Sequence, residues 1–461
     1  MGSLNKMEED FRIRDDARLY RRIPVPENFL VTRDSITFGG DLRIGDLNGD
    51  GYCEFLVYRC VHGAPQGAHV GGIKPCFLGA FDIDGNPIWE AGSGGNQPSR
   101  PMSVAVHDMT GDGSANVICF WHDPDRNAET ADWSRLSDVV VQIRDGKTGA
   151  VMRESEPCEI AERRKMAPDG ANWVHQRILI ANFRGTSAAR DLLVKLGDTY
   201  VALDENLDVL WTYRSPWTKY SKCPAYIPSV GDIDGDGCDE VNGGYFVLDS
   251  EGRPMWEEQL GPHMDSVTID RWDEGNMRAI CSGHGHVMSA EGEIVLKLGA
   301  EKVPHGQEVR VADVRRDYAG NEMVIRYRGH ERFVHVVSSQ TNDIVDSFDL
   351  NASPTNVGME AVYWNGPDEP ALLYNGGMLW DMEQGRGFAL PELPPPQGGD
   401  VHRMSFYHAI PADIVGDERE ELVLWDPAAR HVYIYSPAAV NESVTREYVA
   451  GPRQYNARLM D

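Results

Sequence analysis

Short apolar runs separated by turn-forming residues recur along the whole chain. Each run is too short for a typical helix and is bounded by Gly, Asp, Asn or Pro, as β-strands usually are. Paired runs joined by a turn follow one another about 40–60 residues apart, which is the spacing expected of propeller blades. The chain contains eight such strand–turn–strand units, at residues 42–57, 104–120, 178–194, 227–240, 267–281, 309–325, 360–374 and 412–425.

Several units end on a second hairpin signal, in which Gly, Asn or Asp precedes a short apolar run. These residues supply the positive φ that tight hairpins need, so each unit is predicted to hold four short strands. In three units a tryptophan follows the turn, and we expect Trp89, Trp211 and Trp256 to pack blades together rather than to bind a ligand. The pattern predicts an all-β fold, a single β-propeller of eight blades, with seven as the alternative.

The predicted propeller occupies residues 35–437 and forms one domain. Closed all-β folds often run long as a single unit, so a chain of 461 residues does not require a second domain. The Pro-rich stretch 383–400 is predicted to be a loop rather than a linker. Residues 1–34 are predicted to form an N-terminal extension, and residues 438–461 a C-terminal tail that completes or wraps a blade.

Three of the turns carry oxygen-bearing side chains at positions 1, 3, 5 and 9, with Gly at position 6. Such loops suit Ca²⁺, which takes about 6–8 oxygen ligands. They are not EF-hands, because position 12 carries no Glu and apolar strands rather than amphipathic helices flank them. We expect a bound cation to brace the hairpin and to have a mainly structural role. The predicted ligands are Asp46, Asn48, Asp50 and Glu54; Asp108, Thr110 and Asp112; and Asp232, Asp234, Asp236 and Glu240.

The formal net charge of −28, from 72 acidic and 44 basic residues, argues against nucleic acids and membranes as partners. The eight cysteines are scattered without paired spacing, which favours a reducing compartment over a disulfide framework or a zinc site. The N-terminus has no signal-peptide core, and no apolar run reaches membrane-spanning length. We therefore expect a cytoplasmic protein, or a secreted one if a leader has been removed.

The geometry of a propeller divides its loops between two faces. The turn between the first and second strands of each blade lies on one face. The loop between the second and third strands, and the connection to the next blade, lie on the other face. If the acidic turns occupy the first face, a substrate site is expected on the second. The loops assigned to that second face are rich in His, Arg, Lys and Tyr, which predicts a pocket for an anion.

A single loop histidine is more often a solvated or packing residue than a catalyst, so this prediction depends on the clustering. Connections that lead into the first strand of a blade are expected to lie closest to the propeller axis. The candidate catalytic residues are His122, His175, Tyr226, His263, His305 and His408. The candidate substrate-binding residues are His62, His69, Arg126, Trp217, Lys222, Arg328 and Tyr407.

Together these features resemble the propeller-fold polysaccharide lyases, a group that includes rhamnogalacturonan, ulvan and rhamnose–glucuronate lyases. The resemblance rests on the acidic turns that end at Glu54 and Glu240 and on the Gly-x-Pro-apolar-Trp hairpins that end at Trp89 and Trp256. The face rich in His, Tyr and Arg adds to it. The resemblance covers roughly residues 35–437. No catalytic signature of that group transfers residue by residue.

The resemblance implies cleavage of a uronate-containing oligo- or polysaccharide by β-elimination. A base removes the C5 proton of the uronate, and an acid protonates the leaving oxygen at C4. His and Tyr suit both roles when they lie within hydrogen-bonding reach. The uronate carboxylate must also be neutralised, which is a role for Arg, Lys, protonated His or a metal.

Two alternatives remain open at this stage. A glycoside hydrolase would need two converging carboxylates, and Asp123, Asp125, Asp265 and Glu308 lie in the same loops. A non-catalytic propeller with integrin-type calcium repeats would instead bind carbohydrate or protein. The concentration of His and Arg in one set of loops favours the lyase.

Overall fold

The computed structural model describes most of the chain. The described residues are 5–6, 17–30, 41–62, 73–92, 97–98, 104–121, 140–156, 177–196, 198–216, 225, 227–261, 263–350, 358–396, 407–426, 430–437, 447–451 and 454–456. Within these residues no helix is long or apolar enough to cross a membrane.

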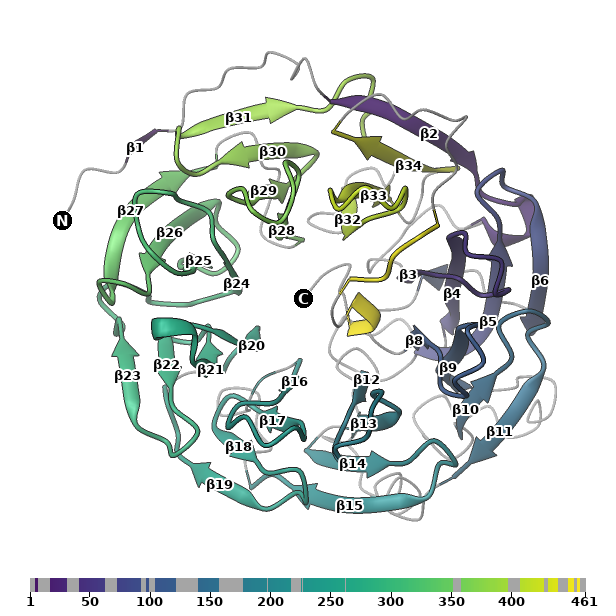
Figure 1. The fold of residues 1–461 in the computed structure, drawn as a ribbon, viewed down its shortest axis with the longest axis horizontal. Coiled ribbons are helices and arrows are strands. Elements are labelled where there is room, and N and C mark those ends of the chain that lie inside the picture. The colour runs from purple at the N-terminus through teal and green to yellow at the C-terminus, as the bar shows by residue number, and fades with distance from the viewer. Residues whose placement is uncertain are drawn as a thin grey trace.

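Eight antiparallel blades are arranged in a ring around one axis, and in the first seven the four strands follow chain order from the inside of the ring to the outside (Figure 1). This arrangement confirms the eight-bladed propeller and excludes the seven-bladed alternative. Blades 1 and 2 are formed by β3 (Asp41–Gly45), β4 (Glu54–His62), β5 (Ile73–Phe81) and β6 (Pro87–Gly92), and by β8 (Val104–His107), β9 (Asn116–Trp121), β10 (Val140–Arg144) and β11 (Val151–Ser155). Blades 3 and 4 are formed by β12 (Arg177–Ala181), β13 (Asp191–Leu196), β14 (Thr199–Leu203) and β15 (Val209–Arg214), and by β16 (Ser229–Gly231), β17 (Glu240–Asn242), β18 (Phe246–Leu248) and β19 (Pro254–Glu257).

The second half of the ring repeats the same order. Blades 5 and 6 are formed by β20 (Val267–Arg271), β21 (Met277–Cys281), β22 (His286–Met288) and β23 (Ile294–Lys297), and by β24 (Glu308–Ala312), β25 (Glu322–Arg326), β26 (Phe333–Ser338) and β27 (Asp343–Asp349). Blades 7 and 8 are formed by β28 (Glu360–Val362), β29 (Leu372–Asn375), β30 (Met378–Asp381) and β31 (Arg386–Ala389), and by β32 (His408–Ala412), β33 (Glu421–Trp425), β34 (His431–Ser436) and β2 (Arg18–Pro24). The short strands β1 (Asn5–Lys6) and β7 (Gln97–Pro98) pair with β27 and β4, and η1 (Glu27–Phe29), η5 (Asp273–Gly275) and η7 (Gln454–Asn456) are 3₁₀ turns.

The N-terminal segment closes the ring. Strand β2 pairs with β34 in antiparallel register, from Arg18 opposite Ser436 to Pro24 opposite His431. The outer strand of blade 8 therefore comes from the start of the chain, while its other three strands come from the end. The residues expected to form an N-terminal extension thus include one strand of the propeller itself.

The described residues of the C-terminal tail contact the first acidic turn and the innermost strand of blade 3. The Tyr448 amide donates to the Gly51 carbonyl at 2.8 Å, beside the first acidic turn. The Asn456 side chain pairs with both the N–H and the C=O of Ile180 on β12, at 2.9 and 2.8 Å. Figure 1 shows η7 near the centre of the ring. Asn456 also lines a cavity of ≈ 190 Å³ bounded by β20, β24 and β28.

The core lies between the blades. Inner strands such as β9, β12 and β33 are buried along their whole length, whereas outer strands such as β6 and β15 alternate with exposed positions. An inner strand has a neighbouring blade on each side and so reads as a continuous apolar run. One apolar cluster joins Leu179, Val230 and Val267, from the first strands of three successive blades.

Tryptophans on the outer strands of blades 1, 3 and 4 each pack against the outer hairpin of the next blade. The Trp211 indole donates to the Ser250 carbonyl at 2.8 Å and lies against Gly252 in the outer hairpin of blade 4. Trp89 meets Gly149 of blade 2 in the same way, and Trp256 meets Gly292 of blade 5. Each glycine has a positive φ and faces an indole ring where a side chain would fit only by displacing it. The structure thus gives these tryptophans the packing role expected from the sequence.

We predict that Gly252→Ala destabilises the protein more than Gly275→Ala. Both glycines have a φ near +80°, but a Cβ at Gly252 would lie 2.5 Å from the Trp211 ring, whereas a Cβ at Gly275 would meet nothing within 4 Å. Gly275→Ala should cost about 1–2 kcal/mol from backbone strain. Gly252→Ala should cost about 1–3 kcal/mol more from overpacking. Equal losses in denaturant unfolding would contradict the interlock.

Candidate functional site

The acidic turns and the candidate catalytic histidines lie at opposite ends of the inner strands. The acidic turns follow the ends of β3, β8 and β16. His263 and Asp265 instead precede the start of β20, and His305 precedes the start of β24. For the described residues, this is the division between two faces that the sequence predicted.

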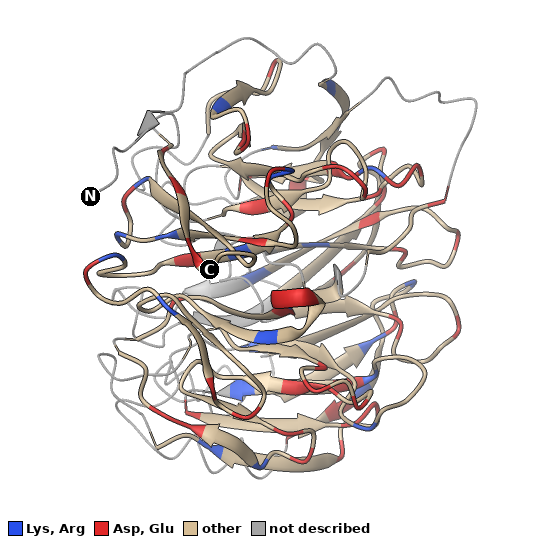
Figure 2. Ribbon diagram, turned by 60° about the vertical axis from the view of Figure 1, so that its left-hand side comes forward, with Lys and Arg blue, Asp and Glu red and all other residues tan. Residues whose placement is uncertain are grey.

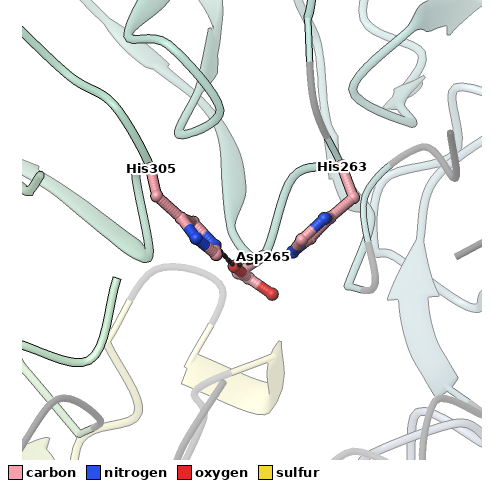
Figure 3. Close-up of side chains that lie close together, drawn as sticks. All are labelled: His263, Asp265 and His305. Carbon is pink, nitrogen blue, oxygen red and sulfur yellow. Dashed lines mark hydrogen bonds and ion pairs between the residues drawn. The ribbon is translucent and has the colours of Figure 1, made fainter. Parts of the chain in front are cut away.

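His263, Asp265 and His305 form one cluster at the second face (Figure 3). The Nε2 atom of His305 lies 3.0 Å from Oδ2 of Asp265, and Nε2 of His263 lies 3.5 Å from the same oxygen. The two imidazole rings are 5.0 Å apart and nearly perpendicular. The Asp265 side chain is 9% exposed and that of His305 41% exposed, so the cluster has a buried carboxylate and an accessible imidazole. We call these three residues the His–Asp cluster.

Burial and hydrogen bonding shift the pKa values of Asp265 and His305 in opposite directions. Burial raises the pKa of Asp265, but the hydrogen bonds from His263 and His305 outweigh it and leave that pKa below its ordinary value. The hydrogen bond to Asp265 raises the pKa of His305 against the opposing effect of burial. An ionised carboxylate that orients an imidazole in this way is the pairing used in general base catalysis. The three ligand atoms also lie within 4.8 Å of one another, close enough to hold a metal ion.

The backbone of the loop between β25 and β26 pairs with that of His305. The His305 amide donates to the Tyr327 carbonyl at 3.2 Å, and the Gly329 amide donates to the His305 carbonyl at 2.7 Å. His305 and Arg328 thereby form an isolated parallel bridge. Arg328 is exposed, and its guanidinium lies over the rings of Tyr327 and Phe333, at 5.4 and 5.3 Å. Two of the predicted site residues thus come from neighbouring segments of one face.

The other described candidates lie deeper in the fold. His408, at the start of β32, is fully buried. Tyr407 is 1% exposed, and its carbonyl accepts a hydrogen bond from the Tyr374 hydroxyl at 2.6 Å. Both lie in the interior between blades 7 and 8, so their roles in catalysis and binding stay predictions.

Most of the remaining candidates are not placed. The backbone of His62 lies in β4, but its side chain is outside the description. The candidates outside the described residues altogether are His69, His122, Arg126, His175, Trp217, Lys222 and Tyr226.

The first and third acidic turns share one pattern of hydrogen bonds from backbone amides to carboxylates. In the first, Asp46 Oδ1 accepts the amide of Gly49 at 2.7 Å, and Glu54 Oε2 accepts that of Leu47 at 2.7 Å. In the third, Asp232 and Glu240 accept backbone amides in the same pattern. Two groups of carboxylates close enough to share an ion result, formed by Asp46, Asp50 and Glu54 and by Asp232, Asp234 and Glu240.

The last carboxylate of each of these two turns lies where its ionised form is unfavourable. Burial, with nearby acidic side chains adding to it, raises the pKa of Glu54 to about 7 and that of Glu240 to about 8. A cation would offset that repulsion. In the second turn, Asp112 Oδ1 instead accepts the Ser114 hydroxyl at 2.6 Å, and Asn116 takes the place of the Glu. Elsewhere, Asp and Glu residues are scattered over many strands and turns of the ribbon (Figure 2).

Asp265 is the site residue whose role sequence reasoning missed. The sequence suggests Asp265 only as one carboxylate of the hydrolase alternative, whereas in the structure it contacts both histidines of the cluster. A signal was available in the His-x-Asp spacing just before an inner strand. That spacing brings both side chains to the same end of a blade.

Comparison with known proteins identifies the family. The model of "Rhamnogalacturonan lyase family 11, C-terminal domain" matches residues 196–456, which is more than half of the chain. The rhamnogalacturonan endolyase YesW of Bacillus subtilis (strain 168) is 23% identical over 271 residues, which cover 52% of this chain and 43% of YesW. The rhamnogalacturonan exolyase YesX of the same organism is 24% identical over 304 residues, which cover 59% of this chain and 49% of YesX. The chain is therefore matched over less than half the length of either curated relative.

Solved structures extend the likeness to nearly the whole chain. The crystal structure of rhamnogalacturonan lyase YesW has a TM-score of 0.69 at 18% identity and covers 94% of this chain and 77% of that chain. The Bacillus licheniformis rhamnogalacturonan lyase PL11 also has a TM-score of 0.69, at 20% identity, and covers 95% of this chain and 78% of that chain. At these identities the likeness shows the propeller fold. Because the family model covers more than half of the sequence, including all three residues of the His–Asp cluster, the chain belongs to rhamnogalacturonan lyase family 11.

Proposed function

We propose that this protein cleaves rhamnogalacturonan at a uronate by β-elimination. The observation that carries the proposal is the His–Asp cluster, which lies at one end of two inner strands within the part of the chain that the family model matches. Two relatives are named as a rhamnogalacturonan endolyase and exolyase, which supports this substrate class. A uronate supplies the carboxylate that makes the adjacent C–H bond acidic enough to break.

His305 is the proposed base. If its Nε2–H donates to Asp265, at 3.0 Å, the lone pair of Nδ1 is left to take the C5 proton. The electrons of the C5–H bond then form a double bond to C4 as the C4–O bond breaks. The leaving oxygen takes a proton, which His263 on the other side of Asp265 can donate when protonated.

Negative charge on the uronate grows as the C5 proton leaves, and a positive group must offset it. Arg328 is the proposed partner, because its backbone is bridged to His305 and its side chain is exposed. The His–Asp cluster also has the donor set of a divalent-cation site, and a cation bound there would supply the same positive charge to the carboxylate. The buried Asp265 keeps both histidines oriented in either case.

We predict that His305→Gln lowers the rate of unsaturated-uronate formation about 10²–10⁴-fold, the usual contribution of a general base. The His305 side chain is 41% exposed, so the melting temperature should change little. The control is His431→Gln, at the start of β34, the third strand of blade 8, which should keep full activity. Near-full activity in His305→Gln, measured by the near-ultraviolet absorbance of the product, would move the reaction away from this cluster.

We also propose that the first and third acidic turns bind Ca²⁺ and stabilise the propeller. The grouped carboxylates and the raised pKa values of Glu54 and Glu240 support this, since each turn carries negative charge that a cation would neutralise. The two turns lie at the opposite ends of the inner strands from the His–Asp cluster. Their cations are therefore proposed as braces for the hairpins.

Chelation of Ca²⁺ is predicted to lower the melting temperature. A ligand that binds only the folded state stabilises it by about 2.7 kcal/mol when its free concentration is 100 times its Kd. The double variant Asp232→Asn/Glu240→Gln should show a smaller calcium-dependent shift, whereas Asp368→Asn, an exposed acid outside the turns, should keep the full shift. The proposal fails if exhaustive chelation leaves the wild-type melting temperature unchanged.

A further inference from the structure

The turn between β21 and β22, residues 282–285, lies between the two segments that carry the His–Asp cluster. The Ser282 amide donates to the carbonyl of Ser266, the residue after Asp265, at 3.0 Å. The amide of Gly306, the residue after His305, donates to the Gly283 carbonyl at 2.8 Å. Both segments are therefore attached to the same short turn by backbone hydrogen bonds.

One side chain of this turn, His284, contacts both segments at positions just N-terminal to the cluster residues. Its Nδ1 lies 2.8 Å from the carbonyl oxygen of Val303, two residues before His305. Because a carbonyl can only accept, Nδ1 carries the hydrogen in this contact. On its other side the ring lies against Gly261, two residues before His263, where a Cβ would come within 2.6 Å of the His284 Cδ2.

The backbone of Gly261 is itself held by a hydrogen bond from a buried side chain. It has a φ of +125°, a conformation that only glycine adopts readily, and its carbonyl accepts the Tyr245 hydroxyl at 2.7 Å. Tyr245 is fully buried. The His284 ring therefore packs against Gly261 in the connection to blade 5 and donates a hydrogen bond to Val303 in the connection to blade 6.

We propose that His284 is a positioning residue, which sets the separation and orientation of His263 and His305 for the β-elimination. This inference rests on the proposed function of the His–Asp cluster. His284 is not one of the three residues whose ligand atoms converge, and its Nδ1–H is already used by Val303. It acts on the reaction through the two segments that it joins.

The test compares His284→Leu with His284→Asn in the full chain. Leucine fills the space without a donor, whereas the asparagine amide can place a donor near the position of Nδ1. His284→Leu should lower kcat about 10–100-fold with little change in KM, because misplacing a catalytic group by about 1 Å costs about 10²-fold. His284→Asn should recover most of that loss. The imidazole NMR signals of His263 and His305 should shift in His284→Leu and return toward wild type in His284→Asn.

Two results would overturn the inference. The first is a folded His284→Leu variant with wild-type kcat and unshifted imidazole signals. The second is a His284→Asn variant that is as impaired as His284→Leu at the same melting temperature, since the donor would then be irrelevant. If His284→Leu does not fold, His284→Gln replaces it, because its longer side chain displaces the donor. If the wild-type protein forms no unsaturated product, the proposed function fails, but the NMR comparison still tests the positioning.

Discussion

The packing of eight blades face to face around one axis determines at which end of the channel the residues that flank each inner strand lie. Neighbouring blades cover both faces of each inner strand, and outer-strand tryptophans pack against the hairpins of adjacent blades. The inner strands therefore line the channel. The N-terminal end of each inner strand then points to one face and its C-terminal end to the other. His263 and Asp265 share one such N-terminal end, and His305, one blade later, lies at the next. The His–Asp cluster is thus a consequence of ring packing.

The repeat made the architecture predictable from the sequence. Alternating apolar runs and turn residues recur once per blade, so the eight blades and the packing role of Trp211 followed from local pattern alone. The same reasoning gave the two faces, because the order of strands within a blade determines which loops meet. His263, His305 and Arg328 were singled out on that ground, and the structure brings their segments together.

Features that depend on contacts distant in sequence were not predictable in this way. The pairing of β2 with β34 joins residues about 400 apart in the chain, and no local signal reports it. The placement of Asn456 against Ile180 is equally non-local. The role of Asp265 depends on His305, which reaches it only because two blades pack side by side. The local pattern therefore predicts which loops lie on one face, while the contacts within the His–Asp cluster depend on the folded ring.

We propose that the chain breaks rhamnogalacturonan by elimination at a uronate. The most direct measurement follows new reducing ends and unsaturated uronate together, on rhamnogalacturonan and on the same polymer with its carboxyl groups reduced to alcohols. Elimination gives one unsaturated uronate for each new reducing end, so both products should rise in equal amounts on the native polymer. Neither should form on the reduced polymer, which lacks the carboxylate that acidifies the C5 proton. Reducing ends without unsaturated uronate, or cleavage of the carboxyl-reduced polymer, would show hydrolysis and contradict the account.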